Sequence, residues 1–496
     1  MVTLGTDQPP ADGLPLCGLA PALQPEQLGD PRFRAAHGVR FAYVCGAMAN
    51  GIASVEMVEA TGQAGMLGFF GSAGLELDEV EQAIERVQNT LGESPYGFNL
   101  INSPHDPEQE KGLVDLYLRR GVRLISAAAY LQLTPPLVRY RVSGIHRDET
   151  GKTVTPHKVV AKVSRVEVAR RFFSPPPEEM LRALVAERSI TAEQAELART
   201  IPLAEDLTAE ADSGGHTDNR PALALLPTML ALRDEMQRTY GYHDGLRVGA
   251  AGGLATPAAV AAAFAMGAAY VLTGSVNQSC VESGTSETVR EMLSQAKQAD
   301  VMMAPAADMF EMGVRVQVLK RGTMFPMRAR KLYELYRTYG SIEDLPADQR
   351  KILERDYFRT SLHEVWTQTR DFFARRDPRQ IDRAEREPKH KMALVFRSYL
   401  GQSSNWANSG DPSRRTDYQV WCGPAMGAFN GWVRGSFLED PQHRHVVTVA
   451  MNLLVGAAAL TRAAWLRAQG VVLGPEAERF DPRSMEELSA LTAADA

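Results

Sequence analysis

The feature that most constrains the fold is a regular alternation of short β-prone runs with longer segments of helical period over residues 38–275. Such alternation is typical of repeated βα units around a parallel sheet. Eight units over about 240 residues come close to the ~250 residues of a typical closed barrel, so the pattern predicts an α/β fold of the (β/α)8 TIM-barrel type. The predicted strands are residues 39–45, 66–70, 96–101, 122–128, 158–163, 206–211, 246–250 and 268–273.

Two stretches interrupt this alternation. Residues 174–202 begin with S-P-P-P, where proline ends the preceding helix, and continue with two amphipathic segments. We interpret them as a helical insertion that forms a lid or wall over the barrel mouth. Beyond about residue 287 strand signals are missing and helical periodicity continues. The predicted organisation is an N-terminal extension (1–37), a barrel (38–300) and a mainly helical subdomain (301–496).

Composition argues against several classes of protein. With 54 basic against 60 acidic side chains and no lysine-rich tail, the chain lacks the footprint of a nucleic-acid binder. The four cysteines form no CxxC pair and the histidines have no companions at metal-ligand spacing, so we expect neither a disulfide scaffold nor a metal site. The most apolar stretch, residues 446–460, is shorter than the ~20 residues of a membrane span and is interpreted as a buried helix. Without a secretory signal, a cytoplasmic protein with no membrane partner is expected.

Two glycine motifs follow the seventh and eighth predicted strands, where TIM barrels often bind phosphate. The first is A-A-G-G-L-A-T-P, with Gly252 and Gly253 before a helix, and the second is T-G-S, with Gly274 and Ser275. Glycines let backbone amides approach an anion, and a helix N-terminus favours negative charge. Each motif alone could be a tight turn; together they favour a cofactor that carries phosphate.

The first and third strands end in residues that suit a flat ring system. The run C-G-A-M-A-N-G-I-A-S places Gly46, Ala47 and Met48 where small side chains and backbone amides leave room for a ring, although close packing of strand and helix explains it equally. In G-F-N-L-I-N, Asn99 is a polar residue among apolar neighbours. A buried amide needs partners, which are either a cofactor or backbone groups.

The run E-A-D-S-G-G-H-T-D-N-R-P after the sixth strand carries the strongest catalytic signal. It places His216 beside Gly214 and Gly215 and near carboxylates at the expected catalytic edge. Histidine titrates near neutrality and can donate a hydrogen bond or a proton to a substrate. Lys162, on the fifth strand, either reaches the cofactor or packs outward. Cys280 has no neighbouring histidine to activate it and is interpreted as structural.

These motifs, in this order and each at a strand end, resemble the PfaD-type enoyl reductases. That family comprises flavin barrels that act in trans on polyunsaturated fatty acid synthases and trans-acyltransferase polyketide synthases. It is similar more distantly to FabK-type enoyl reductases and nitronate monooxygenases. The long run around His216 is the most specific part of the resemblance, which extends into the C-terminal part through L-K-R-G-T-M-F-P-M-R-A-R-K-L-Y.

The resemblance implies an FMN enzyme that takes hydride from NADPH and reduces an α,β-unsaturated thioester on an acyl carrier protein. By position, Gly252, Gly253, Gly274 and Ser275 would hold the FMN phosphate. Residues facing the ring system and the reacting carbons would then be Gly46, Ala47, Met48, Asn99, Lys162, Gly214, Gly215 and His216, with His216 and Lys162 as the catalytic candidates. Whether His216 is the acid or a positioning group stays open.

Two other functions are compatible with the same residues. One is an FMN-dependent oxidase of the nitronate monooxygenase type, and the other is a non-catalytic flavin barrel that serves as a scaffold of a synthase complex. For the carrier protein, the basic residues of the run after residue 319, which are Lys320, Arg321, Arg328, Arg330 and Lys331, form either a docking patch or a solvated helix face. Large apolar helices in the C-terminal part would suit a homodimer.

Overall fold

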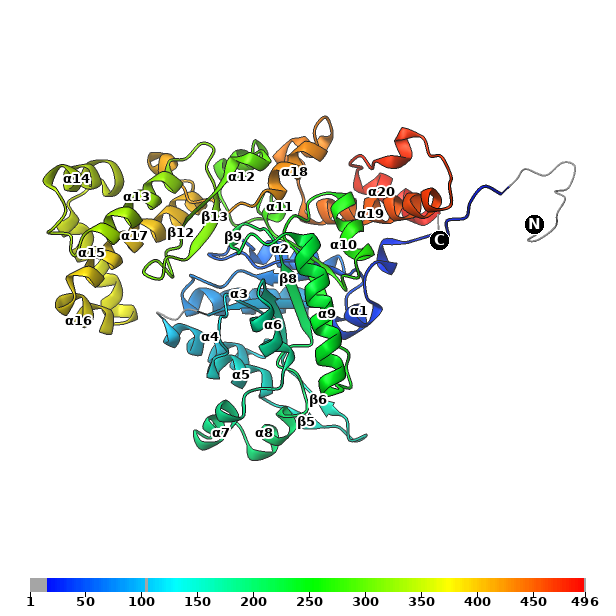
Figure 1. The fold of residues 1–496 in the computed structure, drawn as a ribbon, viewed down its shortest axis with the longest axis horizontal. Helices are drawn as coiled ribbons and strands as arrows, with labels where there is room; N and C mark the ends of the chain where they lie inside the picture. Colours follow the sequence, from blue (N-terminus) through cyan, green and yellow to red (C-terminus); the bar gives the residue numbers. More distant parts are fainter. Residues whose placement is uncertain (1–15, 103–105, 495–496) are drawn as a thin grey trace, which may run out of the picture.

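Eight parallel strands form the centre of the computed structural model, which describes residues 16–102 and 106–494 (Figure 1). They close in the spatial order β1-β11-β10-β8-β7-β4-β3-β2, so every strand has two hydrogen-bonded neighbours and no edge is left open. The predicted (β/α)8 fold is confirmed, and all eight predicted runs contribute a strand. The first 15 residues of the predicted N-terminal extension lie outside the described residues. The strands are β1 Tyr43–Cys45, β2 Leu67–Phe70, β3 Tyr96–Ile101, β4 Leu124–Ala128, β7 Lys158–Val163, β8 Asp206–Glu210, β10 Arg247–Ala251 and β11 Val271–Thr273.

Helices follow the strands because polar caps start them and apolar faces bury them. The side chains of Ser54, Thr134 and Thr256 each accept a hydrogen bond from a backbone N–H in the first turn of the helix that follows. These and similar caps fix where each helix leaves the barrel. The helices of the barrel layer are α1 Pro31–His37, α2 Val55–Gln63, α3 Leu77–Leu91, α4 Pro107–Arg120, α5 Pro135–Val142, α6 Val166–Phe173, α9 Ala222–Tyr240, α10 Pro257–Ala265 and α11 Ser275–Gln278.

The helical insertion is present but does not cover the barrel mouth. Its helices α7 Glu178–Ala186 and α8 Ala192–Ala198 pack against α5, near the small hairpin of β5 His146–Arg147 and β6 Thr153–Val154 (Figure 1). The insertion connects the end of α6 to the beginning of β8, and such a connection lies at the amino ends of barrel strands. Active sites of TIM barrels lie at the carboxyl ends. The expected role as a lid or wall over the mouth is therefore wrong.

A second sheet extends over the strand ends, contrary to the expectation that strands stop near residue 287. The antiparallel strands β12 Val301–Pro305 and β13 Arg315–Leu319 pair with each other, and β13 also pairs with β9 Gly215–His216. β12 reads V-M-M-A-P, and neither its methionines nor its terminal proline is a strong strand signal. The partner strand β9 has only two residues, so its pairing depends on tertiary contact.

The C-terminal helices divide between two cores. One core joins β12 and β13 to α13 and α17 through residues such as Phe325, Leu332 and Phe396, and it forms the lobe at the left of Figure 1. α18 and α19 instead belong to the core of the barrel, through residues such as Phe429 and Leu453. The remaining helices are α12 Glu287–Ser294, α13 Phe325–Thr338, α14 Ala347–Ile352, α15 Leu362–Arg376, α16 Arg379–Arg386, α17 Pro388–Ser409, α18 Ala425–Trp432, α19 Val446–Ala468 and α20 Met485–Ala494.

The most apolar helix, α19, packs inside the protein. By length and composition it could cross a membrane, with a mean hydropathy of 1.6, but 61% of that window is buried among other parts of the chain. It lies against α10, where a Cβ on Gly456 would come within 2.7 Å of Pro257. This close approach supports the interpretation as a buried core helix.

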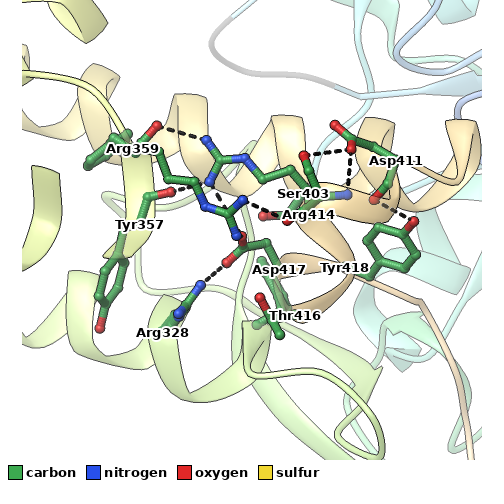
Figure 2. Close-up of polar contacts among 12 residues, drawn as sticks. Arg328, Tyr357, Arg359, Ser403, Asp411, Arg414, Thr416, Asp417 and Tyr418 are labelled. Carbon is green, nitrogen blue, oxygen red and sulfur yellow. Dashed lines mark hydrogen bonds and ion pairs between the residues drawn. The ribbon is translucent and has the colours of Figure 1, made fainter. Parts of the chain in front are cut away.

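A buried carboxylate holds several arginines together in the C-terminal lobe (Figure 2). Asp417 has a fully buried side chain and forms ion pairs with Arg328, Arg359 and Arg414, while the hydroxyl of Tyr399 donates to its Oδ1 at 2.7 Å. The guanidinium of Arg414 also donates to two backbone carbonyls at the end of the neighbouring π-helical turn. One carboxylate therefore fixes three segments that are distant in sequence.

Asp417→Asn is expected to lower the free energy of unfolding by about 3 kcal/mol, because three guanidinium groups lose their shared counter-charge in a mostly buried place. The arginines keep some contact with water, which places the value at the low end of the range for broken buried pairs. Urea unfolding followed by tryptophan fluorescence measures it. Asp348→Asn, at an exposed carboxylate on α14, is the matched control, and an equally small change in both variants would contradict the prediction.

Candidate active site

A pocket at the carboxyl ends of the barrel strands brings together most of the predicted site residues. β1 contributes one wall, β7 and β8 the opposite one, and the loops after β10 and β11 close the end. Trp421 and Ala425 from the C-terminal part complete the rim. The predicted residues that line it are Gly46, Ala47, Met48, Lys162, Gly214, Gly252, Gly253, Gly274 and Ser275.

The turn after β10 has the geometry of an anion cradle. Gly252 and Gly253 have φ angles of 83° and 76°, which favour glycine. A Cβ on Gly252 would come within 2.6 Å of the backbone of Ala211, whereas a Cβ on Gly253 would enter open space. Within the described residues no protein acceptor takes the N–H of Gly253, and α10 begins four residues later with Pro257 in its first turn. The turn therefore offers a free backbone donor and room in front of it.

The turn after β11 adds donors on the same side of the pocket. The N–H groups of Gly274 and Ser275 also have no acceptor among the described residues, and a Cβ on Gly274 would meet nothing within 4 Å. The Oγ of Ser275 accepts from the N–H of Gly423 at 3.1 Å, which fixes the C-terminal segment against the pocket. Two neighbouring turns thus present unpaired amides, the donor type that binds phosphate at strand-to-helix turns.

The end of β1 is held close to the neighbouring strands. The N–H of Gly46 donates to the carbonyl of Thr273 at 2.9 Å, and a Cβ at Gly46 would come within 2.5 Å of Leu272. The N–H groups of Ala47 and Met48 have no acceptor among the described residues. Because a larger residue at Gly46 would push this segment outward, the strand end presents its free amides at a fixed distance from the pocket.

Lys162 points into the pocket, which decides between the two orientations considered from the sequence. Its Nζ pairs with Oε1 of Glu210 at 2.8 Å, and Ser213 donates to the same carboxylate oxygen at 3.0 Å. All three residues line the pocket. The ammonium group is therefore neutralised by Glu210 and held at the wall of the pocket.

His216 lies beside this pair on β9 and contacts a residue from the C-terminal half. Its Nε2 is 3.1 Å from Oδ1 of Asp308, and both side chains are 32% exposed. Partial burial disfavours the imidazolium, but the charge and hydrogen bond of Asp308 outweigh it, so the pKa of His216 is raised above its ordinary value. Its other ring nitrogen, Nδ1, has no hydrogen-bond partner among the described residues. A protonated His216 could donate through that atom.

Asn99 forms hydrogen bonds with other groups of the protein, which is the second of the two roles considered for it. Its Oδ1 accepts from the N–H of Ala73 at 3.0 Å and from Ser72 at 3.2 Å, and the residue is 6% exposed. Asn99 is absent from the pocket lining, as are Gly215 and His216, which pair with Gln317 and Val316 in the second sheet. A contact of Asn99 or Gly215 with the cofactor stays a prediction.

Cys280 is buried, and burial raises the pKa of its thiol well above the ordinary value. A thiol in that state is a poor nucleophile. The interpretation as a structural cysteine is consistent with this position.

Sequence reasoning missed four residues of the site: Glu210, Ser213, Trp421 and Asp308. Glu210 and Ser213 lie inside the run that contains His216, and the carboxylate at a strand end was a usable signal. Trp421 and Asp308 come from the region beyond the barrel. Nothing in their local sequence indicates that they return to the strand ends, because the second sheet carries them there.

The residues present fit a flavin that carries a phosphate. The free amides of two turns and the open space in front of Gly253 suit a phosphate group, and the small residues at the end of β1 leave room for a ring. Lys162 lines the same pocket as the glycine turns, and His216 lies two residues after Gly214, which also lines it. The arrangement can therefore orient a phosphate-bearing cofactor and place a proton donor beside it.

The fold and the pocket define the class as a TIM barrel with glycine-rich turns at the carboxyl ends of its strands. A family model described as nitronate monooxygenase matches residues 32–344, and a model of the inserted helical domain of [acyl-carrier-protein] S-malonyltransferase matches residues 339–418. The chain superposes on the enoyl reductase domain of MlnA from the macrolactin biosynthesis cluster of Bacillus amyloliquefaciens with a TM-score of 0.85 and 40% identity, covering 90% of this chain and 100% of that domain.

Curated relatives point to the same group. The chain is 49% identical to a polyunsaturated fatty acid synthase protein of Thraustochytrium sp. and 48% identical to polyketide biosynthesis protein PksE of Bacillus subtilis, over 91% and 88% of its length. It spans 31% of the first protein and 56% of the second. FabK of Thermotoga maritima, at 18% identity and a TM-score of 0.52, shares the fold.

The chain belongs to the nitronate monooxygenase family and, within it, is grouped with the enoyl reductase domain of MlnA. The resemblance to PfaD-type enoyl reductases is thereby confirmed.

Proposed function

We propose that this protein is an FMN-dependent enoyl reductase that uses NADPH to reduce the α,β-double bond of enoyl thioesters on an acyl carrier protein, in polyketide or polyunsaturated fatty acid biosynthesis. The observation that carries the proposal is a pocket that combines an amide-lined anion cradle with the Lys162–Glu210 pair, together with the His216–Asp308 pair within electrostatic reach of Lys162 and Glu210. The 40% sequence identity to the enoyl reductase domain of MlnA, which extends over that whole domain, supports the reaction type. The names of the curated relatives support the pathway class.

Different residues of the chain would have different roles in such a reaction. Bound FMN would supply hydride transfer from NADPH to the β-carbon of the substrate. The amides of Gly253, Gly274 and Ser275 would bind its phosphate, and the amides of Ala47 and Met48 would orient its ring. His216, protonated at Nδ1, would donate its proton to the α-carbon and so remove the enolate charge of the thioester. Lys162 adds positive charge on the same side, moderated by Glu210.

The carrier protein is the proposed partner. Of the basic residues considered for its docking, two form ion pairs within this chain. Arg328 is engaged with the buried Asp417, and Arg330 pairs with Glu334 one turn along α13. Lys320, Arg321 and Lys331 have no ion pair among the described residues, and of these Lys331 is half-buried whereas Lys320 and Arg321 are exposed. Of the predicted basic cluster, these two side chains are the ones best placed to attract an acidic partner.

Stepwise anaerobic absorbance spectra test the proposal. We expect the purified protein to show flavin absorbance, NADPH to bleach it, and a crotonyl thioester on a carrier protein or on pantetheine to restore it. The family model keeps oxidation of a nitronate as the second candidate. A bleached flavin that only oxygen or a nitronate restores would favour that candidate, and a protein unable to retain flavin would indicate a non-catalytic scaffold.

A further inference from the structure

The residue that contacts His216, Asp308, belongs to a segment outside the barrel. Asp308 lies in the connection between β12 and β13, about 90 residues after His216 in the chain, and its carboxylate meets Nε2 of the imidazole at 3.1 Å. Nothing in the barrel strands supplies an equivalent acceptor to this nitrogen among the described residues. The hairpin of β12 and β13 therefore completes a pair that the barrel alone does not contain.

The position of this hairpin is determined by pairing with the strand that carries His216. Val316 of β13 is opposite His216, and Gln317 is opposite Gly215. The side-chain amide of Gln317 also donates to Oδ1 of Asp212 and to the carbonyl of Ser213, both at 2.8 Å. Backbone and side-chain hydrogen bonds therefore anchor the hairpin that carries Asp308 beside the strand that carries His216.

We propose that Asp308 is a positioning residue for the reaction: it keeps the proton on Nε2 of His216, so that Nδ1 is the ring nitrogen left to exchange a proton with the substrate. This inference rests on the proposed reductase function. A carboxylate accepts and does not donate, so in the neutral imidazole Nε2 carries the hydrogen and Nδ1 is bare. When His216 gains a second proton, that proton sits on Nδ1, the atom without a protein partner.

Burial disfavours the protonated form of His216, but the charges around the pair outweigh it and raise the pKa of His216. Asp308 stabilises the imidazolium, Glu210 adds to this effect, and Lys162 opposes it. Burial disfavours the Asp308 carboxylate, but His216 and the more distant Arg397 outweigh this, so the pKa of Asp308 is lowered. Arg397 is itself paired with Glu311 of the same hairpin. The balance of these groups favours the charged form of the Asp308 carboxylate and the protonated form of His216 relative to the isolated side chains.

The test combines a direct titration with a pH profile of activity. NMR spectra of the whole chain labelled with 15N-histidine follow the titration of the imidazole nitrogens. The signal of His216 is assigned as the one that is missing from the spectrum of His216→Gln. We expect the wild type above its pKa to show the Nε2–H tautomer, and Asp308→Asn to lower the pKa of His216 by about one unit or more because a counter-charge is lost. The fall in kcat with rising pH should shift by the same amount, giving about tenfold lower kcat above both pKa values with KM little changed.

Matched variants separate this role from a structural one. Asp308→Glu keeps the charge and should restore part of the pKa and of kcat, while Asp348→Asn removes an exposed charge on α14 and should change neither. An Nδ1–H tautomer in the wild type, or an unchanged His216 titration in Asp308→Asn, would overturn the proposal. A wild type that shows the expected titration but reduces no enoyl thioester would refute the reductase function and leave the positioning of His216 by Asp308 intact.

Discussion

Replacing His216 by glutamine is expected to lower the rate of enoyl thioester reduction by about 100-fold or more, because the reaction loses its proton donor to the α-carbon. The side chain stands on the short strand β9, with Nδ1 unpaired among the described residues and Nε2 bound to Asp308. Glutamine keeps a polar group of similar length but cannot transfer a proton at neutral pH. Stopped-flow absorbance of the two half-reactions measures the effect.

The half-reactions distinguish a donor from a residue that only shapes the pocket. Bleaching of the flavin by NADPH needs no proton on the acyl substrate, so its rate in His216→Gln should stay within a few-fold of the wild type, and only reoxidation by the thioester should slow. His443→Gln changes an exposed histidine outside the pocket and is the control. Equal slowing of both half-reactions in His216→Gln would show that the histidine supports the pocket rather than the chemistry.

Replacing Gly253 by alanine is expected to weaken FMN binding by at least about tenfold, which corresponds to a loss of about 1.4 kcal/mol. The methyl group would occupy the open space in front of the Gly253 amide, where the proposed phosphate binds. It would also strain a backbone with a φ of 76°, at a cost of about 1 kcal/mol. Quenching of FMN fluorescence by apoprotein measures the dissociation constant.

Gly241 offers a control with the same strain and no cofactor nearby. It ends α9 with a φ of 60°, and a Cβ there would also meet nothing within 4 Å. Gly241→Ala should therefore lose a similar amount of stability and bind FMN as the wild type does. If the two variants bound FMN equally well, the phosphate would not sit at the turn after β10.

The barrel could be predicted because each of its units carries its own signal. A run such as residues 158–163 is apolar and β-prone, and the helices between the strands repeat their apolar residues at helical spacing, several of them after a polar cap. The glycine turns were predictable for a related reason. Gly252 has both a positive φ and a backbone neighbour within 2.6 Å, so the requirement for glycine is local and visible in the residue type.

Contacts between distant segments decided what the sequence had left open or, for the lid, had given wrongly. The insertion of residues 174–202 has the amphipathic pattern of a helical pair, but its place at the amino ends of the strands follows from chain connectivity around the barrel. The role of Asn99 depended on which groups surround it, and the structure surrounds it with Ser72 and Ala73. The basic run of α13 suggested a surface patch, yet Arg328 turns inward to a buried carboxylate.

The amino-acid sequence by itself determined the barrel, the two glycine turns and the histidine beside them, because periodicity, caps and special φ angles act over a few residues. Only the tertiary structure decided that Lys162 pairs with Glu210 inside the pocket and that Asp308 meets His216. The partner of His216 comes from the hairpin of β12 and β13, which reaches the site by pairing β13 with the two residues of β9. Such pairing depends on backbone hydrogen bonds between segments far apart in the chain, and these leave little trace in local residue patterns.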